Sequence, residues 1–257
     1  MPLAQAKANN VPPAPAAASA LVVLRDDALM RLWRREGTGD RLVVCCSGVG
    51  KRDDQLPEAE FNRLAFREAA DHLLFFADPG RTWLNAPGLI EALVQEIEAE
   101  AKRVGASEIC IVGHSMGAYA AMVLPAFTKI DVAVAFSPQY VVDPALLPEE
   151  TRWENWRSKI GQFRIASVAD HLVPSCQYFV FHGRNRGEAV QRNLVKPLAN
   201  LDMFVMPGTI HRTPKKLKEF GVLDAVLEAC FAKDRPQLFQ IMKDRVSAEI
   251  VSQERAS

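Results

Sequence analysis

The chain has 257 residues, of which 49% are hydrophobic, and this is enough to bury one sizeable core. Its 31 Lys and Arg residues balance 31 Asp and Glu residues, so the net charge of zero gives no global reason to expect nucleic acid or an anionic membrane as a partner. No run of 18 apolar residues occurs, which argues against a helix that crosses a bilayer.

The N-terminal segment 1–20 is rich in Ala and Pro and has neither a helical nor a strand period, which predicts a flexible tail. It lacks the basic stretch and apolar stretch of a secretory signal, so we expect a cytoplasmic protein. The five cysteines lie mostly in apolar runs and are expected to be buried, reduced thiols. Their spacing does not suggest a zinc site, and residues 21–257 are expected to form one domain.

Short apolar runs alternate with longer amphipathic segments from residue 21 onward. The apolar runs predict eight strands, at 21–24, 30–33, 42–46, 73–77, 108–112, 132–136, 178–181 and 203–206. The amphipathic segments predict helices at 58–70, 87–104, 115–127 and 187–199 and a helical face within 220–231. This alternation predicts an α/β fold with a mainly parallel sheet that helices cover on both faces. Ligands of such sheets bind beyond the carboxyl ends of the strands, so the residues after each apolar run are the candidates for a site.

A candidate nucleophile follows the strand 108–112. The segment Gly113-His114-Ser115-Met116-Gly117 fits the pattern G-x-S-x-G and lies where this strand meets the helix from 115. A sharp turn there lifts the Ser115 hydroxyl clear of the sheet, and the glycines avoid clashes within the turn. The backbone N–H of Met116 would then face the carbonyl oxygen of a substrate. The alternative is a glycine-rich turn that contains an incidental serine.

A candidate general base follows the last predicted strand. The order along the chain in folds with this turn is Ser, acid, His, so the base is sought after Ser115. His211 lies in the loop between the strand 203–206 and the final helical face, at the carboxyl end of the sheet. His114 lies inside the turn of the nucleophile and His182 closes a strand. We therefore predict His211 as the base, the alternative being a solvated loop histidine.

Two carboxylates compete for the role of the acid that orients the base. Glu188 is the nearest carboxylate after the strand 178–181, and it is our first choice. Asp143, after the strand 132–136, could also reach His211. Glu188 could instead be an ordinary charge in the first turn of a helix, where acids are favoured.

The chain resembles esterases of the α/β-hydrolase fold through the segment 113–117, through His182-Gly183 and through His211. The resemblance covers about residues 20–232. It implies an eight-stranded sheet, a Ser-His-acid triad, and neither a cofactor nor a metal.

One position departs from this family pattern. Many relatives carry Asp three residues after the glycine of His182-Gly183, whereas this chain has Arg186 there. The departure puts the usual acid in doubt. The segments 78–83 and 137–140 also look like a little-characterised bacterial branch of the fold.

A second oxyanion donor and a cap complete the expected site. The donor should come from the loop 47–50 after the third strand, and we favour the N–H of Val49 over a plain glycine turn. The segment 138–176 between the sixth and seventh strands predicts a short cap. Trp153 and Trp156 lie three residues apart in it and would share a helical face, where they either bind substrate or pack the cap onto the core.

These features predict a serine hydrolase that cleaves a small-molecule carboxylic ester through an acyl-enzyme on Ser115. An acyltransferase, in which a sugar hydroxyl or a thiol replaces water, would use the same groups. A non-catalytic binding module of this fold is the third possibility, and Arg186 keeps it open because the usual acid is absent.

Overall fold

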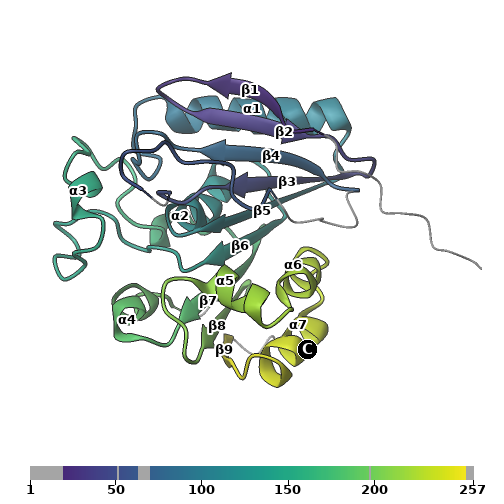
Figure 1. Ribbon diagram of the computed structural model, residues 1–257, viewed down its shortest axis with the longest axis vertical. Coiled ribbons are helices and arrows are strands. Elements are labelled where there is room, and N and C mark those ends of the chain that lie inside the picture. Colours follow the sequence, from purple (N-terminus) through teal and green to yellow (C-terminus); the bar gives the residue numbers. More distant parts are fainter. Residues whose placement is uncertain (1–19, 51, 63–69, 197, 253–257) are drawn as a thin grey trace, which may run out of the picture.

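The computed structural model describes residues 20–50, 52–62, 70–196 and 198–252 (Figure 1). Within these residues one sheet contains nine strands in the order β1-β2-β4-β3-β5-β6-β7-β8-β9. Their bounds are β1 Val22–Asp26, β2 Arg31–Arg35, β3 Arg41–Cys46, β4 His72–Ala77, β5 Glu108–His114, β6 Val132–Phe136, β7 Gln177–Gly183, β8 Leu201–Met206 and β9 Glu249–Ser252. Strands β3 to β8 pair in parallel, while β1 and β2 at one edge and β9 at the other pair antiparallel.

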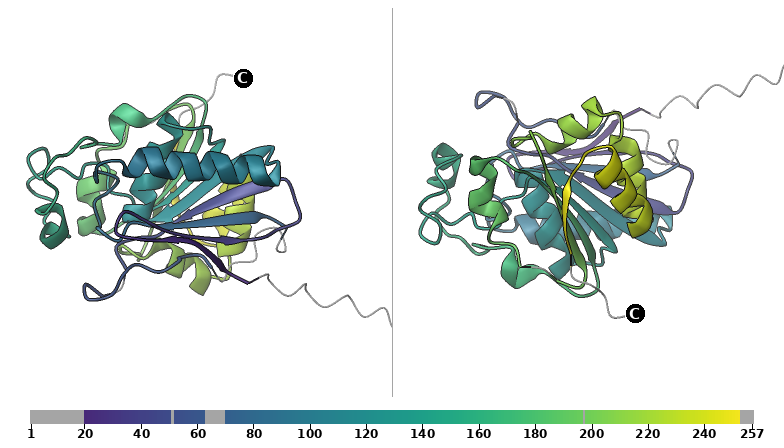
Figure 2. Two further views of the ribbon diagram at one scale, coloured as in Figure 1. Left: turned by 90° about the horizontal axis from the view of Figure 1, so that it is seen from above. Right: turned by 90° about the horizontal axis from the view of Figure 1, so that it is seen from below.

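Seven α-helices and two short 3-10 helices accompany the sheet in the described residues. The α-helices are α1 Leu89–Val104, α2 Met116–Val123, α3 Glu154–Arg157, α4 Arg186–Arg192, α5 Thr213–Glu219, α6 Leu223–Phe231 and α7 Arg235–Asp244. The 3-10 helices are η2 Leu124–Ala126 and η3 Ala169–His171. Figure 2 shows α1 across one face of the sheet and α5, α6 and α7 over the other.

The central strands are apolar throughout because both of their faces are buried. Every residue of β3 is buried, and neighbouring side chains point to opposite faces, as the pleat requires. Leu42 and Val44 join the hydrophobic cluster that contains α1 and α2, whereas Val43 and Cys45 join the cluster that contains residues of α5, α6 and α7. This two-sided burial confirms the expected α/β class with a mainly parallel sheet.

Most of the predicted elements are present, with shifted ends. All eight predicted strands have counterparts, β1 to β8, and the helix predicted at 87–104 is α1, which ends at Gly105 with a left-handed φ of 63°. The helix predicted from 115 ends at Val123 and continues as η2, because Pro125 has no N–H to donate to the preceding turn.

Three other expectations need correction. The helix predicted at 58–70 lies partly outside the described residues. Residues 58 and 59 have no regular structure and residues 60–62 form a turn instead, with Phe61 at a φ of 63° that a helix excludes. The helix predicted at 187–199 is the shorter α4, whose C-cap is Asn193. Strand β9 and helix α7 were not expected, because the sequence after residue 231 shows no strong apolar period.

The segment between β6 and β7 extends beyond the carboxyl ends of the strands and contains α3 and η3 (Figure 1). Hydrogen bonds tie this cap to the core at Ile165. The Ile165 carbonyl accepts a hydrogen bond from the Tyr119 hydroxyl at 2.7 Å, and its N–H donates to the Asn85 side chain at 2.8 Å. The cap is therefore held over the edge of the sheet where ligands of parallel sheets bind.

The five cysteines are buried and free, as expected. Burial raises the pKa of the Cys45, Cys46 and Cys110 thiols, so these side chains behave as small apolar groups. Of the helices in the described segments, none combines the length and the hydropathy that a bilayer crossing needs.

Candidate active site

Ser115 lies in a strained turn between β5 and α2. Its φ of 57° and ψ of −120° are unusual for a residue with a side chain, and its N–H donates to the Phe136 carbonyl at 2.9 Å. Both glycines of the motif are required by close backbone approaches. A Cβ on Gly113 would lie 2.1 Å from the Gly117 carbonyl oxygen, and one on Gly117 would lie 2.1 Å from the Cys46 carbonyl oxygen. The turn is therefore a nucleophile elbow in its geometry.

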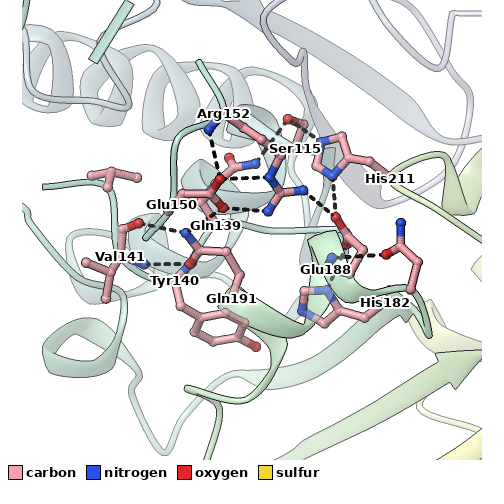
Figure 3. A network of polar contacts seen from close by, with 12 residues as sticks. Ser115, Gln139, Tyr140, Val141, Glu150, Arg152, His182, Glu188, Gln191 and His211 are labelled. Carbon is pink, nitrogen blue, oxygen red and sulfur yellow. Dashed lines mark hydrogen bonds and ion pairs between the residues drawn. The ribbon is translucent and has the colours of Figure 1, made fainter. Parts of the chain in front are cut away.

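Three side chains from distant parts of the chain form one hydrogen-bonded series (Figure 3). The Nε2 atom of His211, in the loop after β8, lies 2.9 Å from the Ser115 hydroxyl oxygen. The Nδ1 atom of His211 lies 2.8 Å from the Oε1 atom of Glu188, which is in the first turn of α4 after β7. This arrangement allows a hydroxyl proton to pass to an imidazole that a carboxylate orients.

The Glu188 carboxylate is buried and has partners on both oxygens. Besides His211, Oε1 accepts a hydrogen bond from Arg152 at 2.7 Å, and Oε2 accepts one from the Nδ1 atom of His182 at 3.1 Å. Burial alone would raise the pKa of Glu188, but the hydrogen bonds from His182 and His211 outweigh it and hold this pKa far below its usual range. The carboxylate is therefore ionised at neutral pH.

Two further histidines form hydrogen bonds with members of this series. His182 is fully buried, and burial lowers its pKa, so it is neutral and carries its proton on Nδ1 toward Glu188. Burial also lowers the pKa of His114, whose Nε2 atom lies 2.8 Å from the carbonyl oxygen of His211 and thereby holds the backbone of His211 in place.

The other candidate carboxylate has a different environment. Asp143 accepts a hydrogen bond at 2.8 Å from the N–H of Ala145 in its own turn. The carboxylate that accepts the hydrogen bond from His211 is that of Glu188 instead. Arg186, at the position where many relatives carry Asp, begins α4.

The two expected oxyanion donors lie in segments next to the nucleophile. Met116 is the first residue of α2, directly after Ser115, and is buried. Val49 follows Gly48, where a Cβ would lie 3.6 Å from the Ser115 Cβ, so this loop passes close to the nucleophile. The Val49 carbonyl accepts a hydrogen bond from Arg81 at 2.7 Å, which holds the loop in place.

Trp153 and Trp156 have different neighbours. Trp153 precedes α3 with a left-handed φ of 57°, and its ring centre lies 4.7 Å from that of His211. Trp156, inside α3, lies 4.2 Å from the guanidinium of Arg81 and donates a hydrogen bond to Asp53 at 3.3 Å. The prediction that Trp153 and Trp156 share a helical face is therefore wrong, because the left-handed conformation of Trp153 places this residue outside the helix.

Three polar residues of the site were not identified from the sequence: His182 and Arg152, which contact Glu188, and Gln139, which contacts Ser115. His182 carried a signal as part of His182-Gly183, and Gln139 lies in the segment 137–140 that looks like a branch of the fold, whereas Arg152 carried none. In the described part of the chain, no group of three His, Cys, Asp or Glu side chains is arranged to hold a metal ion.

No protein-family model and no curated protein matches the chain. An esterase from Pyrococcus furiosus is similar in structure, with a TM-score of 0.52 and 17% identity over 79% of this chain and 87% of that one. Est1E from Butyrivibrio proteoclasticus has a TM-score of 0.53 and 15% identity, over 87% of this chain and 100% of that one. A capsule O-acetyltransferase of Neisseria meningitidis serogroup A has a TM-score of 0.54 and 10% identity, over 79% of this chain and 94% of that one.

These similarities define the fold. The chain adopts the α/β-hydrolase fold, as the sequence resemblance implied, with a ninth strand at the C-terminal edge of the sheet. Its structural neighbours include esterases, hydrolases and an acetyltransferase. A fold shared at this level of identity does not identify a substrate, so the activity is argued from the site.

Proposed function

We propose that this protein is a serine hydrolase that cleaves a small-molecule carboxylic ester through an acyl-enzyme on Ser115. The observation that carries the proposal is the hydrogen-bonded series from Ser115 through His211 to Glu188, which starts at a strained elbow. A binding module would have no need of an ionised, buried carboxylate behind a histidine. That carboxylate also supports the proposal where Arg186 replaces the usual acid, because Glu188 lies two residues later and contacts His211.

In the proposed reaction, His211 takes the proton of the Ser115 hydroxyl as its oxygen attacks the ester carbonyl carbon. The ionised Glu188 stabilises the imidazolium that forms, and the N–H groups of Met116 and Val49 hold the oxyanion. The alcohol leaves with the proton from His211. Water then attacks the acyl-enzyme, with His211 again as the base.

The surroundings of the triad suggest where substrate lies. Trp153 packs beside the ring of His211, so we expect it to border the leaving group, and Trp156 would border the entrance beside the loop that contains Val49. The five free cysteines favour the reducing cytoplasm as the place of action.

The test is labelling by a fluorophosphonate probe together with hydrolysis of p-nitrophenyl acetate. Wild-type protein should be labelled, and Ser115→Ala should lose both labelling and several orders of magnitude in kcat, since removing a nucleophile disables the whole series. Ser158→Ala, at an exposed serine of the cap, is the matched control and should behave as wild type. Equal turnover by Ser115→Ala with an unchanged melting temperature would overturn the proposal.

The same site could pass the acyl group to an acceptor other than water. The specific observation in favour is the acetyltransferase among the structural neighbours, which was solved in complex with CoA. Adding sugar hydroxyls or thiols to the p-nitrophenyl acetate assay separates the two activities. An acyltransferase would release p-nitrophenol faster with an acceptor and would form the acylated acceptor.

A further inference from the structure

A glutamine that follows β6 contacts the nucleophile directly. Gln139 is almost fully buried, and its side-chain Nε2 atom lies 3.3 Å from the Ser115 hydroxyl oxygen. Its Oε1 atom accepts a hydrogen bond from the indole N–H of Trp83 at 2.9 Å. Figure 3 shows the Gln139 side chain next to Ser115, on the cap side of the triad.

The indole fixes which end of the amide faces the serine. An indole N–H is a donor only, so the atom of Gln139 that faces Trp83 must be the oxygen. The amide nitrogen therefore faces Ser115 and brings an N–H to its hydroxyl oxygen. A flipped amide would set two donors against each other at Trp83 inside a buried site.

Trp83 is itself held firmly. It is fully buried, and Arg81, Trp83 and Leu84 adopt left-handed φ values of 52°, 49° and 64°. The side chain of Asn85 donates to the Trp83 carbonyl at 2.9 Å and to the Ile165 carbonyl at 3.2 Å, which joins this loop to the cap. Such strain persists where the surroundings determine the backbone completely, and it is frequent at functional sites.

A neighbouring glutamine shows what a purely structural amide does here. The side chain of Gln191 accepts hydrogen bonds from the backbone N–H groups of Tyr140 and Val141 and donates to the Val141 carbonyl, so it fastens one loop to α4. The hydrogen bonds of Gln139 go instead to a fixed indole and to the nucleophile. Its position is therefore that of a group that acts on Ser115.

We propose that Gln139 is a catalytic residue whose amide N–H acts on the nucleophilic oxygen of Ser115. This inference rests on the proposed function. A serine oxygen has one proton and two lone pairs. Because the Gln139 N–H occupies a lone pair, the hydroxyl proton is directed to Nε2 of His211.

The same hydrogen bond sets the orientation of the hydroxyl for the attack. The Oγ–H bond of Ser115 breaks and its proton moves to Nε2 of His211, while an electron pair of Oγ forms the bond to the acyl carbon and the π pair of the carbonyl moves to the carbonyl oxygen. The negative charge therefore develops on the carbonyl oxygen, which the N–H groups of Met116 and Val49 would hold. Gln139 keeps both of its protons throughout. It acts instead by directing the hydroxyl, so that the hydroxyl proton faces His211 and the remaining lone pair of Oγ faces the substrate.

Gln139→Met tests this role, because methionine has a similar length and no N–H. We expect kcat/KM for p-nitrophenyl acetate to fall about 10- to 100-fold with KM nearly unchanged, because a misdirected hydroxyl slows the chemical step without altering substrate binding. The rate of labelling by the fluorophosphonate probe should fall by the same factor. Gln177→Met, the same exchange at the start of β7, is the matched control and should keep wild-type rates.

A second variant keeps the test valid if methionine disturbs the packing. Gln139→Glu retains an acceptor for Trp83 but offers a carboxylate to Ser115, so it should lose at least as much kcat as Gln139→Met. Wild-type kcat/KM in either folded variant would overturn the role of Gln139, as would a loss confined to KM. If wild-type protein is neither labelled nor active, the proposed function fails instead, which is a different result.

Discussion

Glu188, the proposed acid of the site, shows how one side chain is held in a single position. Glu188 lies two residues beyond the place where many relatives carry Asp, and its extra methylene spans part of that shift. Asn185 caps α4 by accepting a hydrogen bond from the Glu188 N–H at 3.0 Å, which sets the direction in which the side chain leaves the helix. His182 and Arg152 then engage the carboxylate oxygens, so a single rotamer is favoured.

A comparison of Glu188→Gln with Asp143→Asn tests this assignment, since each exchange keeps the shape and removes the charge. We expect Glu188→Gln to lower kcat by a factor on the order of 10⁴, because His211 loses the carboxylate that sets its tautomer and stabilises its charged form. Asp143→Asn should change kcat by less than about twofold. A large loss in Asp143→Asn alone, measured on p-nitrophenyl acetate, would transfer the role to Asp143.

At the scale of the elements, one arginine holds the loop after β3 in place. Arg81 is buried and donates to the carbonyl oxygens of Val49 at 2.7 Å and Gln55 at 2.5 Å. Its guanidinium also lies 4.2 Å from the ring centre of Trp156 in the cap. One planar cation therefore connects the expected oxyanion loop to the cap, with donors in a fork that lysine cannot reproduce.

Arg81→Lys should loosen this loop. We expect kcat/KM to fall about tenfold and the melting temperature to fall by a few degrees, because the loss of buried hydrogen bonds costs about 1–3 kcal/mol in the free energy of unfolding. Arg164→Lys is the control, since Arg164 forms an exposed ion pair with Glu91 that contributes little. An Arg81→Lys protein with wild-type kinetics would show that Arg81 does not position the loop.

At the scale of the whole molecule, the ionised carboxylates of the site make the stability of the folded protein depend on pH. Glu150 and Glu188 are both buried, and Arg152 binds both carboxylates. Burial opposes their ionisation, but the hydrogen bonds and charge of Arg152 at Glu150, and the hydrogen bonds of His182 and His211 at Glu188, lower both pKa values. A carboxylate with a lowered pKa in the folded state stabilises that state above the pKa of the unfolded chain, about 4.3 for Glu.

This stabilisation is lost as the pH falls below about 4.3 toward the lower folded-state pKa values. We expect the melting temperature of the wild-type protein to decline as the pH is lowered from about 5 to about 2. Glu188→Gln should decline less steeply, because it has no proton to bind at this position. Glu154→Gln, at an exposed residue of α3, should follow the wild-type curve. Parallel curves for wild type and Glu188→Gln, measured by circular dichroism, would contradict this linkage.

Much of the fold could be predicted from the sequence alone. The strands of the parallel sheet are buried on both faces and therefore appear as continuous apolar runs, and α1 shows its helical period between clear ends. The elbow at Ser115 was identifiable because its glycines and its strand–helix junction are local features. The position of His211 after the last strand followed from the order of elements along the chain.

The tertiary structure alone decided which side chains meet beyond the carboxyl ends of the strands. Glu188 was the first choice from the sequence, but its contact with His211 depends on where α4 starts after its cap at Asn185. Arg152 and Gln139 reach the site from a cap and a loop that have no regular period. Strand β9 likewise depends on pairing with β8, far from it in the sequence. The physical reason is the same in each case: local patterns determine helices and strands, whereas the path of a loop depends on contacts between residues that are distant along the chain.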